Sequence, residues 1–322
     1  METRPPRNLG LDLVRATEAA ALAASRFTGL GDLDEPNRAA AEAMVNALNT
    51  LDMDGHIVIG EEGRLGAHTA LDTGQRVGTG DGPAMDVVVN PIDGRALIAN
   101  FKTGSLAVAA VAPRGSMWRP APAVYMDKII VDREVAGALV PECMNAPAAW
   151  TVALVARVKK KAVRDVVVFV LDRPRHRDLI EEVRRAGARI LLRSDGDIGG
   201  ALLAADPKSQ VDLLMGIGGA SESVIAACAV KALGGSMLAR LAPQSAAERE
   251  AVAAAGLDTR SILRCDELVA SQQIFFAATG ITDSLVLSGV RFLGQVAVTE
   301  SLVLRAETGT RRLIQTEHRL TP

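Results

Sequence analysis

The first fifty residues carry the apolar spacing of two helices. The segment LGLDLVRATEAAALAASRF (9–27) is rich in Ala and Leu, with its charges on one side. Ala and Leu favour helices, and this spacing gathers the apolar side chains on one face. A second Ala-rich stretch follows Pro36, a residue that suits a first helical turn, and runs to about Asn49. We predict two helices packed on the core.

From His56 the pattern changes to short β-branched runs that glycines interrupt, which is typical of strands and their loops. Three loops in this region concentrate polar groups: Gly60 to Glu62, Asn90 to Arg95, and the segment around Tyr125. The predicted strands lie in HIVIG, GQRVGTGDGP, AMDVVVNPIDG, GSLAVAAVA and AVYMDKIIVD.

Beyond Trp150 the order strand, polar loop, helix occurs three times. Apolar runs at 165–171, 189–192 and 211–215 each precede such a loop. Runs that are apolar on both faces and alternate with helices indicate parallel strands covered by helices. Ligands bind outside the carboxyl ends of such strands, so we expect the three loops to lie together.

The last eighty residues predict a charged helix over 243–256 and strands within 273–283, 294–306 and 310–320. No repeat of 20 to 50 residues and no low-complexity tail is visible. The pattern predicts an α/β fold with a parallel-sheet C-terminal half. We place a domain boundary near residue 150, giving units 1–150 and 151–322.

Composition narrows the class of protein. The 322 residues are 48% hydrophobic and 23% charged, enough for a substantial core. With 36 basic and 38 acidic residues the net charge is −2, which disfavours nucleic-acid binding. Three distant cysteines without a CxxC pair indicate a reducing compartment. Because no apolar run reaches ~18 residues and no signal peptide is evident, we expect a cytoplasmic protein without a membrane partner.

The loop GIGGASES (216–223) offers glycines and the amides of a helix start, which attract phosphate or carboxylate. Ser221 or Glu222 can cap that helix. The alternative is an ordinary strand-to-helix turn whose glycines only satisfy tight geometry. The spacing is not that of a dinucleotide fingerprint, and no GxSxG elbow is present.

Two further loops carry charged groups of opposite sign. Arg173 and Arg175 can clamp a phosphate, with Lys128 near Tyr125 as another positive contact, or they form a solvated basic turn. The pair in Asp195-Gly196-Asp197 can bind sugar hydroxyls or a cation, or serve the turn itself.

Acidic residues also follow other predicted strands. Glu61, Asp93 and Glu222 together suggest an oxygen-ligand cluster for Mg²⁺.

Taken in order, these motifs resemble the class II fructose-1,6-bisphosphatases, a branch of the metal-dependent, lithium-sensitive sugar phosphatases. The resemblance implies a layered sugar-phosphatase fold with alternating helix and sheet layers, a phosphorylated sugar as substrate, and a homo-oligomer. The motifs that carry it are VRATEAAALAA, LDMDGHIVIGEEG, VGTGDGPAMDVVVNPIDG, VYMDKIIV, RPRH, DGD, VDLLMGIGGASESV, FFAATGIT and TESLVLRAETGTRRLIQTEH.

The substrate residues that the resemblance implies are all present, whereas the implied metal site is altered. Two of its five carboxylates are amides here, and Arg95 stands where the family has the Thr that orients the attacking water. The acidic GEGEID stretch of the family reads GEEGRL here. The substrate positions are Tyr125, Arg173, Arg175, Asp195, Asp197 and Gly219, and the metal positions are Asn37, Glu61, Asn90, Asp93 and Glu222.

Charge decides between the expected functions. Five carboxylates would carry −5, whereas three carboxylates with Arg95 carry −2. A guanidinium 4 Å from a divalent cation repels it by ~8 kcal/mol at an effective dielectric constant of 20. Since Mg²⁺ and Mn²⁺ prefer anionic oxygens, we expect weak binding of either metal, or none.

We therefore expect a protein that binds a phosphorylated sugar, with hydrolysis lost or strongly reduced, and with Arg95, Asp93 and Glu61 as the remaining candidate catalytic residues. One alternative is an active Mg- or Mn-dependent phosphatase that uses a metal on Glu61, Asp93 and Glu222. Another is a metal-free enzyme that isomerises or eliminates on a sugar phosphate.

Overall fold

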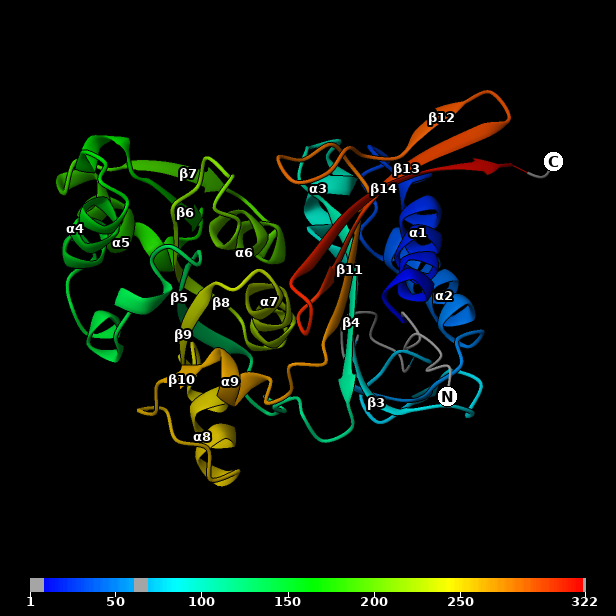
Figure 1. Cartoon of the computed structure of the whole chain (residues 1–322), viewed down its shortest axis with the longest axis horizontal. Helices are drawn as coiled ribbons and strands as arrows, with labels where there is room; N and C mark the ends of the chain where they lie inside the picture. Colours follow the sequence, from blue (N-terminus) through cyan, green and yellow to red (C-terminus); the bar gives the residue numbers. More distant parts are fainter. Residues whose placement is uncertain (1–8, 61–68, 321–322) are drawn as a thin grey trace, which may run out of the picture.

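Helix and sheet layers alternate through the molecule (Figure 1). The computed structural model describes residues 9–60 and 69–320. Two helices cover one sheet, two lie between the sheets, and two cover the outer face of the other sheet. In that order they are α1 (Leu9–Ser25), α2 (Asp34–Leu48), α6 (Asp197–Ala205), α7 (Ala220–Ala232), α4 (Ala148–Val158) and α5 (Arg177–Arg185). This arrangement confirms the predicted α/β fold with alternating layers.

The first sheet combines strands from both ends of the chain. Its strands are β1 (Asp54–Ile59), β2 (Arg76–Val77), β3 (Ala84–Asp93), β4 (Leu106–Pro113), β11 (Phe275–Gly280), β12 (Arg291–Leu293), β13 (Val296–Arg305) and β14 (Thr310–Arg319). The order is β12-β13-β11-β4-β3-β1-β2, and β14 also pairs with β13. Strands β1 and β3 are parallel, and the other pairs are antiparallel.

The second sheet is mixed. Its strands are β5 (Tyr125–Val131), β6 (Val167–Leu171), β7 (Arg189–Arg193), β8 (Leu213–Gly219), β9 (Ser236–Leu241) and β10 (Leu263–Arg264), in the order β10-β9-β5-β8-β6-β7. The three strands predicted as parallel, β6, β7 and β8, are parallel. The second sheet as a whole is not parallel, because β5 lies between β8 and β9 and runs antiparallel to both.

The domain division at residue 150 stays a prediction, and hydrogen-bonded sheets are shared across it. Strand β5 precedes residue 150 but belongs to the second sheet, while β11 to β14 return to the first. The remaining α-helices of the described ranges are α3 (Arg95–Ala99), α8 (Ala246–Ala254) and α9 (Cys265–Leu268). Four short 3-10 helices of the same ranges lie at Ala136–Ala138, Pro141–Met144, Val163–Asp165 and Pro174–His176. None of the helices in the described ranges is long and apolar enough to cross a membrane.

The helices predicted over 9–27 and 243–256 are shorter in the structure, at Leu9–Ser25 and Ala246–Ala254. Helix α2 begins at Asp34, two residues before Pro36, which lies in its first turn as predicted. The Asp32 carboxylate accepts hydrogen bonds from the amides of Asp34 and Glu35, at 2.8 and 3.1 Å. An acceptor just before a helix satisfies amides that have no partner within it, so the helix starts earlier.

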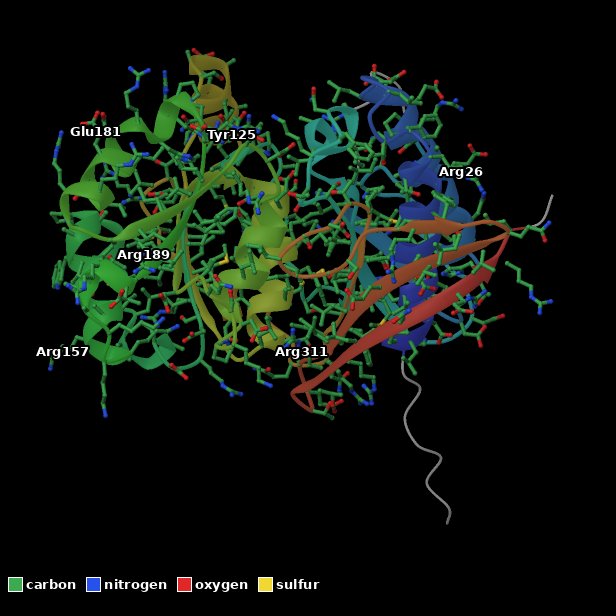
Figure 2. All side chains as sticks on the ribbon, turned by 90° about the horizontal axis from the view of Figure 1, so that it is seen from above. Arg26, Tyr125, Arg157, Glu181, Arg189 and Arg311 are labelled. Carbon is green, nitrogen blue, oxygen red and sulfur yellow. The ribbon has the colours of Figure 1, made fainter. Side chains whose placement is uncertain are left out.

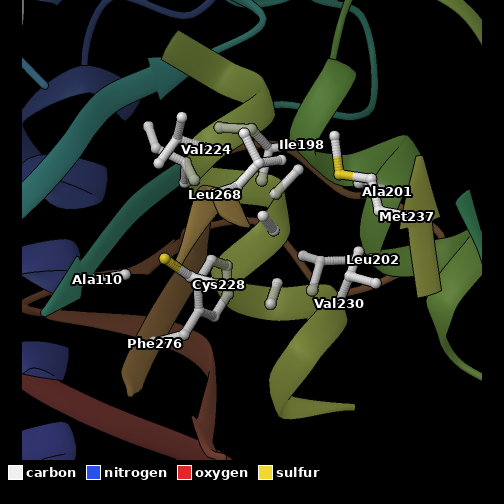
Figure 3. Packing of buried hydrophobic residues seen from close by; sticks show 14 of the residues in the cluster. Ala110, Ile198, Ala201, Leu202, Val224, Cys228, Val230, Met237, Leu268 and Phe276 are labelled. Carbon is white, nitrogen blue, oxygen red and sulfur yellow. The ribbon is translucent and has the colours of Figure 1, made fainter. Parts of the chain in front are cut away.

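Alternate residues of the first sheet pack into two separate hydrophobic cores, one on each face. Val87 and Val89 of β3 pack toward α1 and α2, whereas Val88 packs toward α6 and α7. Figure 3 shows the second of these cores, where Cys228 of α7 lies beside Phe276 of β11 and Val224 of the same helix lies beside Leu268. Because helices cover both faces, β3 and β4 are apolar at successive positions rather than at every second one.

Candidate functional site

A cavity of about 930 Å³ collects most of the residues predicted for the site. The carboxyl ends of β3, β6 and β8, the start of β5 and the loop after β7 form its walls. The expected meeting of the three loops that follow β6, β7 and β8 is thereby confirmed. The predicted residues that line the cavity are Asn90, Asp93, Arg95, Tyr125, Arg173, Arg175, Asp195, Asp197, Gly219 and Glu222.

Two predicted positions are not among these lining residues. Asn37 is fully buried in α2. Glu61 lies outside the described residues, as do Arg64 and Leu65 of the altered acidic stretch.

Arg175 and His176 both hydrogen-bond to the backbone of one residue of β8, Ile217. The Arg175 guanidinium donates through Nε and Nη2 to the carbonyl oxygen of Ile217, at 3.1 and 2.9 Å. The Ile217 amide donates to His176 Nε2 at 2.8 Å, and His176 Nδ1 lies 2.6 Å from the carbonyl oxygen of Leu171. An accepting Nε2 leaves the proton on Nδ1, so the ring is neutral. Burial lowers the pKa of His176 below its usual value, which favours the same state.

This geometry assigns different tasks to the two arginines. One edge of the Arg175 guanidinium is engaged with Ile217, and its Cζ atom lies 4.9 Å from the centre of the Tyr125 ring. Arg173 is more weakly held, with Nη2 3.7 Å from Asp195 Oδ1, and its side chain is 39% exposed. The predicted two-arginine clamp therefore consists of one engaged and one accessible guanidinium.

Tyr125 is held by a residue that the sequence interpretation missed. The buried Glu248 carboxylate accepts hydrogen bonds from the amides of Val124, Tyr125 and Gln244, at 2.8, 2.9 and 2.8 Å. Figure 2 shows Tyr125 close to α8, the helix that contains Glu248. The available signal was the Ser245-x-x-Glu248 spacing, in which the Ser245 hydroxyl accepts from the Glu248 amide at 3.1 Å.

Lys128 does not reach the Tyr125 side of the sheet. Its side chain is 1% exposed and forms an ion pair with Asp197 at the start of α6. Residues three apart in a strand point to opposite faces, and Lys128 shares its face with Met126 and Ile130. The expectation of a second positive contact beside Tyr125 is wrong for this reason.

The glycine-rich loop ends without a side-chain cap. Helix α7 begins at Ala220, directly after Gly219, so Ser221 and Glu222 lie inside its first turn. The expectation that Ser221 or Glu222 caps the helix is therefore wrong. Glu222 instead folds over Gly219, where a methyl group would overlap its carboxylate.

Asp93 joins the two halves of the site. Its Oδ2 accepts hydrogen bonds from the amides of Ile198 and Gly199, each at 3.1 Å, in the first turn of α6. Burial, followed by the nearby carboxylates of Asp195 and Asp197, raises the pKa of Asp93 well above its usual value. One oxygen of a candidate metal ligand thus serves as a helix cap.

The described donors do not fit a centre of several divalent ions. They comprise the carboxylates of Asp93 and Glu222 and the amides of Asn37 and Asn90, with Arg95 half-buried on the same wall. Within residues 9–60 and 69–320, no group of three or more His, Cys, Asp and Glu side chains is placed to hold a metal ion. Such centres need anionic oxygens.

Comparison with known proteins defines the family. Residues 7–318 match the family described as bacterial fructose-1,6-bisphosphatase, glpX-encoded. The chain belongs to the class II fructose-1,6-bisphosphatase family, as its motifs predicted. It is 37% identical to the fructose-1,6-bisphosphatase class 2 of Haemophilus influenzae, over 98% of this chain and 97% of that protein. It is 36% identical to fructose-1,6-bisphosphatase 1 class 2 of Escherichia coli K12, over 98% and 96%.

Proposed function

We propose that this protein binds a phosphorylated sugar in the cavity and that metal-dependent hydrolysis is lost or strongly reduced. The observation that carries the proposal is the set of side chains at the implied metal positions. Asp93 Oδ2 is committed to two backbone amides, Asn37 and Asn90 replace carboxylates, and Arg95 adds a permanent positive charge.

The remaining residues supply sugar-phosphate recognition. Arg173 offers an accessible guanidinium, a group whose planar fork matches phosphate oxygens. Arg95 offers a second cation on the opposite wall, suited to another phosphate group. Asp195 and Asp197 supply carboxylate oxygens that accept hydrogen bonds from sugar hydroxyls. A fructose bisphosphate carries phosphates at both ends and hydroxyls between them, and the cavity lining offers both guanidiniums and carboxylate oxygens.

A second candidate function rests on family membership. Relatives at 36–37% identity are named fructose-1,6-bisphosphatases, and all the implied substrate positions are retained. An active phosphatase would hold Mg²⁺ or Mn²⁺ on Glu61, Asp93 and Glu222, and a metal-free sugar-phosphate enzyme would use the same cavity. The cytoplasmic location, the homo-oligomer and the absence of a nucleic-acid partner stay predictions.

Binding and turnover are measured separately on the full chain. Calorimetry with fructose 1,6-bisphosphate is run once with EDTA and once with Mn²⁺, and phosphate release is followed under the same conditions. We expect binding in EDTA and little release with either metal. Turnover near the ~10 s⁻¹ of ordinary enzymes would overturn the loss of hydrolysis. Binding that requires metal would favour the active phosphatase.

A further inference from the structure

A lysine ion pair lies beneath the floor of the cavity. Lys128 of β5 is 1% exposed, and an ammonium group is costly to bury unless it is paired. Its partner Asp197 is itself 7% exposed and lines the cavity. The charge of Lys128 therefore acts on the binding site through Asp197, without reaching the ligand.

Lys128 also connects two of the loops that form the floor. Its Nζ donates to the Ser223 hydroxyl at 3.3 Å, and that hydroxyl donates to the carbonyl oxygen of Gly219 at 2.7 Å. Asp197 starts α6, whereas Gly219 ends β8. One buried ammonium group thus links the aspartate turn to the glycine-rich loop.

The glycine-rich loop provides the space for this pair. A methyl group at Gly218 would overlap the Asp197 carboxylate and lie 2.6 Å from Lys128 Nζ. Any larger side chain at this position would displace the ion pair. Gly218, which also lines the cavity, therefore leaves the room that the buried salt bridge occupies.

The pair also sets the charge that a ligand meets. The described residues that line the cavity include four carboxylates, of Asp93, Asp195, Asp197 and Glu222, and three guanidiniums, of Arg95, Arg173 and Arg175. Their formal sum is −1, and Lys128 brings it to zero. Without Lys128 an unpaired anion would face an anionic ligand.

We propose that Lys128 is a positioning residue that neutralises Asp197 and fixes the Gly219 loop, so that the cavity accepts a phosphorylated sugar. This inference rests on the proposed function. The effect is electrostatic, so it depends on the presence of Asp197 and not only on the volume of the lysine side chain.

Three variants of the full chain test this role by calorimetry with fructose 1,6-bisphosphate in EDTA. Lys128→Met is expected to weaken binding by about tenfold or more, because it leaves Asp197 buried and unpaired. The double variant K128M/D197N is expected to bind more tightly than K128M, since both charges are gone. Lys128→Arg keeps the charge and is expected to lose less affinity than K128M. A double variant no tighter than K128M would overturn the electrostatic role.

A second buried lysine provides the control. Lys159 pairs with Asp132 and Asp212, at 2.6 and 2.8 Å, and does not line the cavity. Lys159→Met is expected to lower the melting temperature while leaving the Kd unchanged. A Kd that changes equally in K159M and K128M would reduce Lys128 to a general stabilising residue and overturn the proposal.

The possible failures can be told apart. A wild-type protein that binds no sugar phosphate overturns the proposed function and with it the ligand assigned here. Wild-type binding with an unchanged Kd in K128M overturns the role of Lys128 alone. If K128M does not fold, K128M/D197N carries the test, because it buries no unpaired charge. Because this double variant also lacks a carboxylate oxygen that can accept from the sugar, it is compared with K128R, which keeps both charges. K128R binding more tightly than K128M/D197N supports the proposal, and K128R binding no more tightly overturns it.

Discussion

The two walls of the cavity differ in how far they keep the residues that the family resemblance implies. The wall formed by the start of β5 and the loops after β6, β7 and β8 retains each implied substrate position, and hydrogen bonds connect its parts, as where Arg175 and His176 bind the backbone of Ile217. The wall formed by β3 and the start of α3 has an amide at Asn90 and a cation at Arg95, while the amide of Asn37 lies buried in α2, outside the lining. Both walls are equally part of the folded core, because Asn37 and Asn90 are buried.

This difference separates binding from chemistry. Hydrogen-bond donors and fixed cations are sufficient to hold a sugar phosphate, whereas the metal-dependent hydrolysis that the family resemblance implies needs an anionic wall. The fold itself does not require these positions to be anionic, since the neutral side chains of Asn37 and Asn90 occupy buried positions in α2 and β3. A family member can therefore keep the fold and the ligand pocket while its metal centre changes.

The largest expected effect comes from restoring the altered wall. The triple variant N37D/N90D/R95T restores the two carboxylates and the threonine that the family resemblance implies at these positions. We expect Mn²⁺-dependent phosphate release from fructose 1,6-bisphosphate to rise by at least ~100-fold, because a metal stabilises transition-state charge. Phosphate release is measured beside the wild type and beside R95T alone. If the triple variant released phosphate as slowly as the wild type, the loss of hydrolysis would not be explained by these three positions alone.

The next largest effect concerns the accessible arginine of the retained wall. Arg173→Ala is expected to weaken fructose 1,6-bisphosphate binding by about tenfold or more, since it removes a charged hydrogen-bond donor. The exposed Arg157 of α4, labelled in Figure 2, provides the matched control. Arg157→Ala should leave the Kd unchanged in the same calorimetric titration. Equal losses in both variants would indicate a general charge effect.

A smaller effect is expected at Glu248. Glu248→Ala leaves three backbone amides without their acceptor, so we expect the free energy of unfolding to fall by about 1–3 kcal/mol. Affinity should fall several-fold because Tyr125 and the stacked Arg175 lose support. The stability and affinity of Glu248→Gln should lie between those of the wild type and Glu248→Ala, since one oxygen acceptor remains. The exposed Glu250 on the same helix is the control, and E250A should change stability by less than about 0.5 kcal/mol. Urea unfolding and calorimetry measure both quantities.

The smallest effect concerns pH. Burial lowers the pKa of His176, so its neutral form stabilises the fold above the usual pKa of about 6.5. That contribution is lost as the pH falls below this value, because the unfolded chain takes up the proton more readily. Between pH 7.5 and 5.5 the wild type should lose more unfolding free energy than His176→Gln, by less than ~1.4 kcal/mol per pH unit. Urea unfolding at the two pH values measures both losses, and an equal loss in the wild type and in His176→Gln would exclude this role.

Much of the site was predictable because its residues follow strands. Apolar runs indicated β6, β7 and β8, and parallel strands place their carboxyl ends together. The meeting of Arg173, Asp195 and Gly219 around one cavity therefore followed from local pattern. The mixed character of the second sheet did not follow from local pattern, because the sequence of β5 indicates a strand but not which strands it pairs with.

The sequence by itself determined the order of elements, the residues available to the cavity and the charge of the altered wall, because periodicity and residue type are local properties. Only the tertiary structure decided that Arg175 holds Ile217, that Asp93 caps α6 and that Lys128 pairs with Asp197. The partners in these contacts are 42, 105 and 69 positions apart. No local pattern fixes which face of one element meets which end of another, because packing of the whole chain sets those distances.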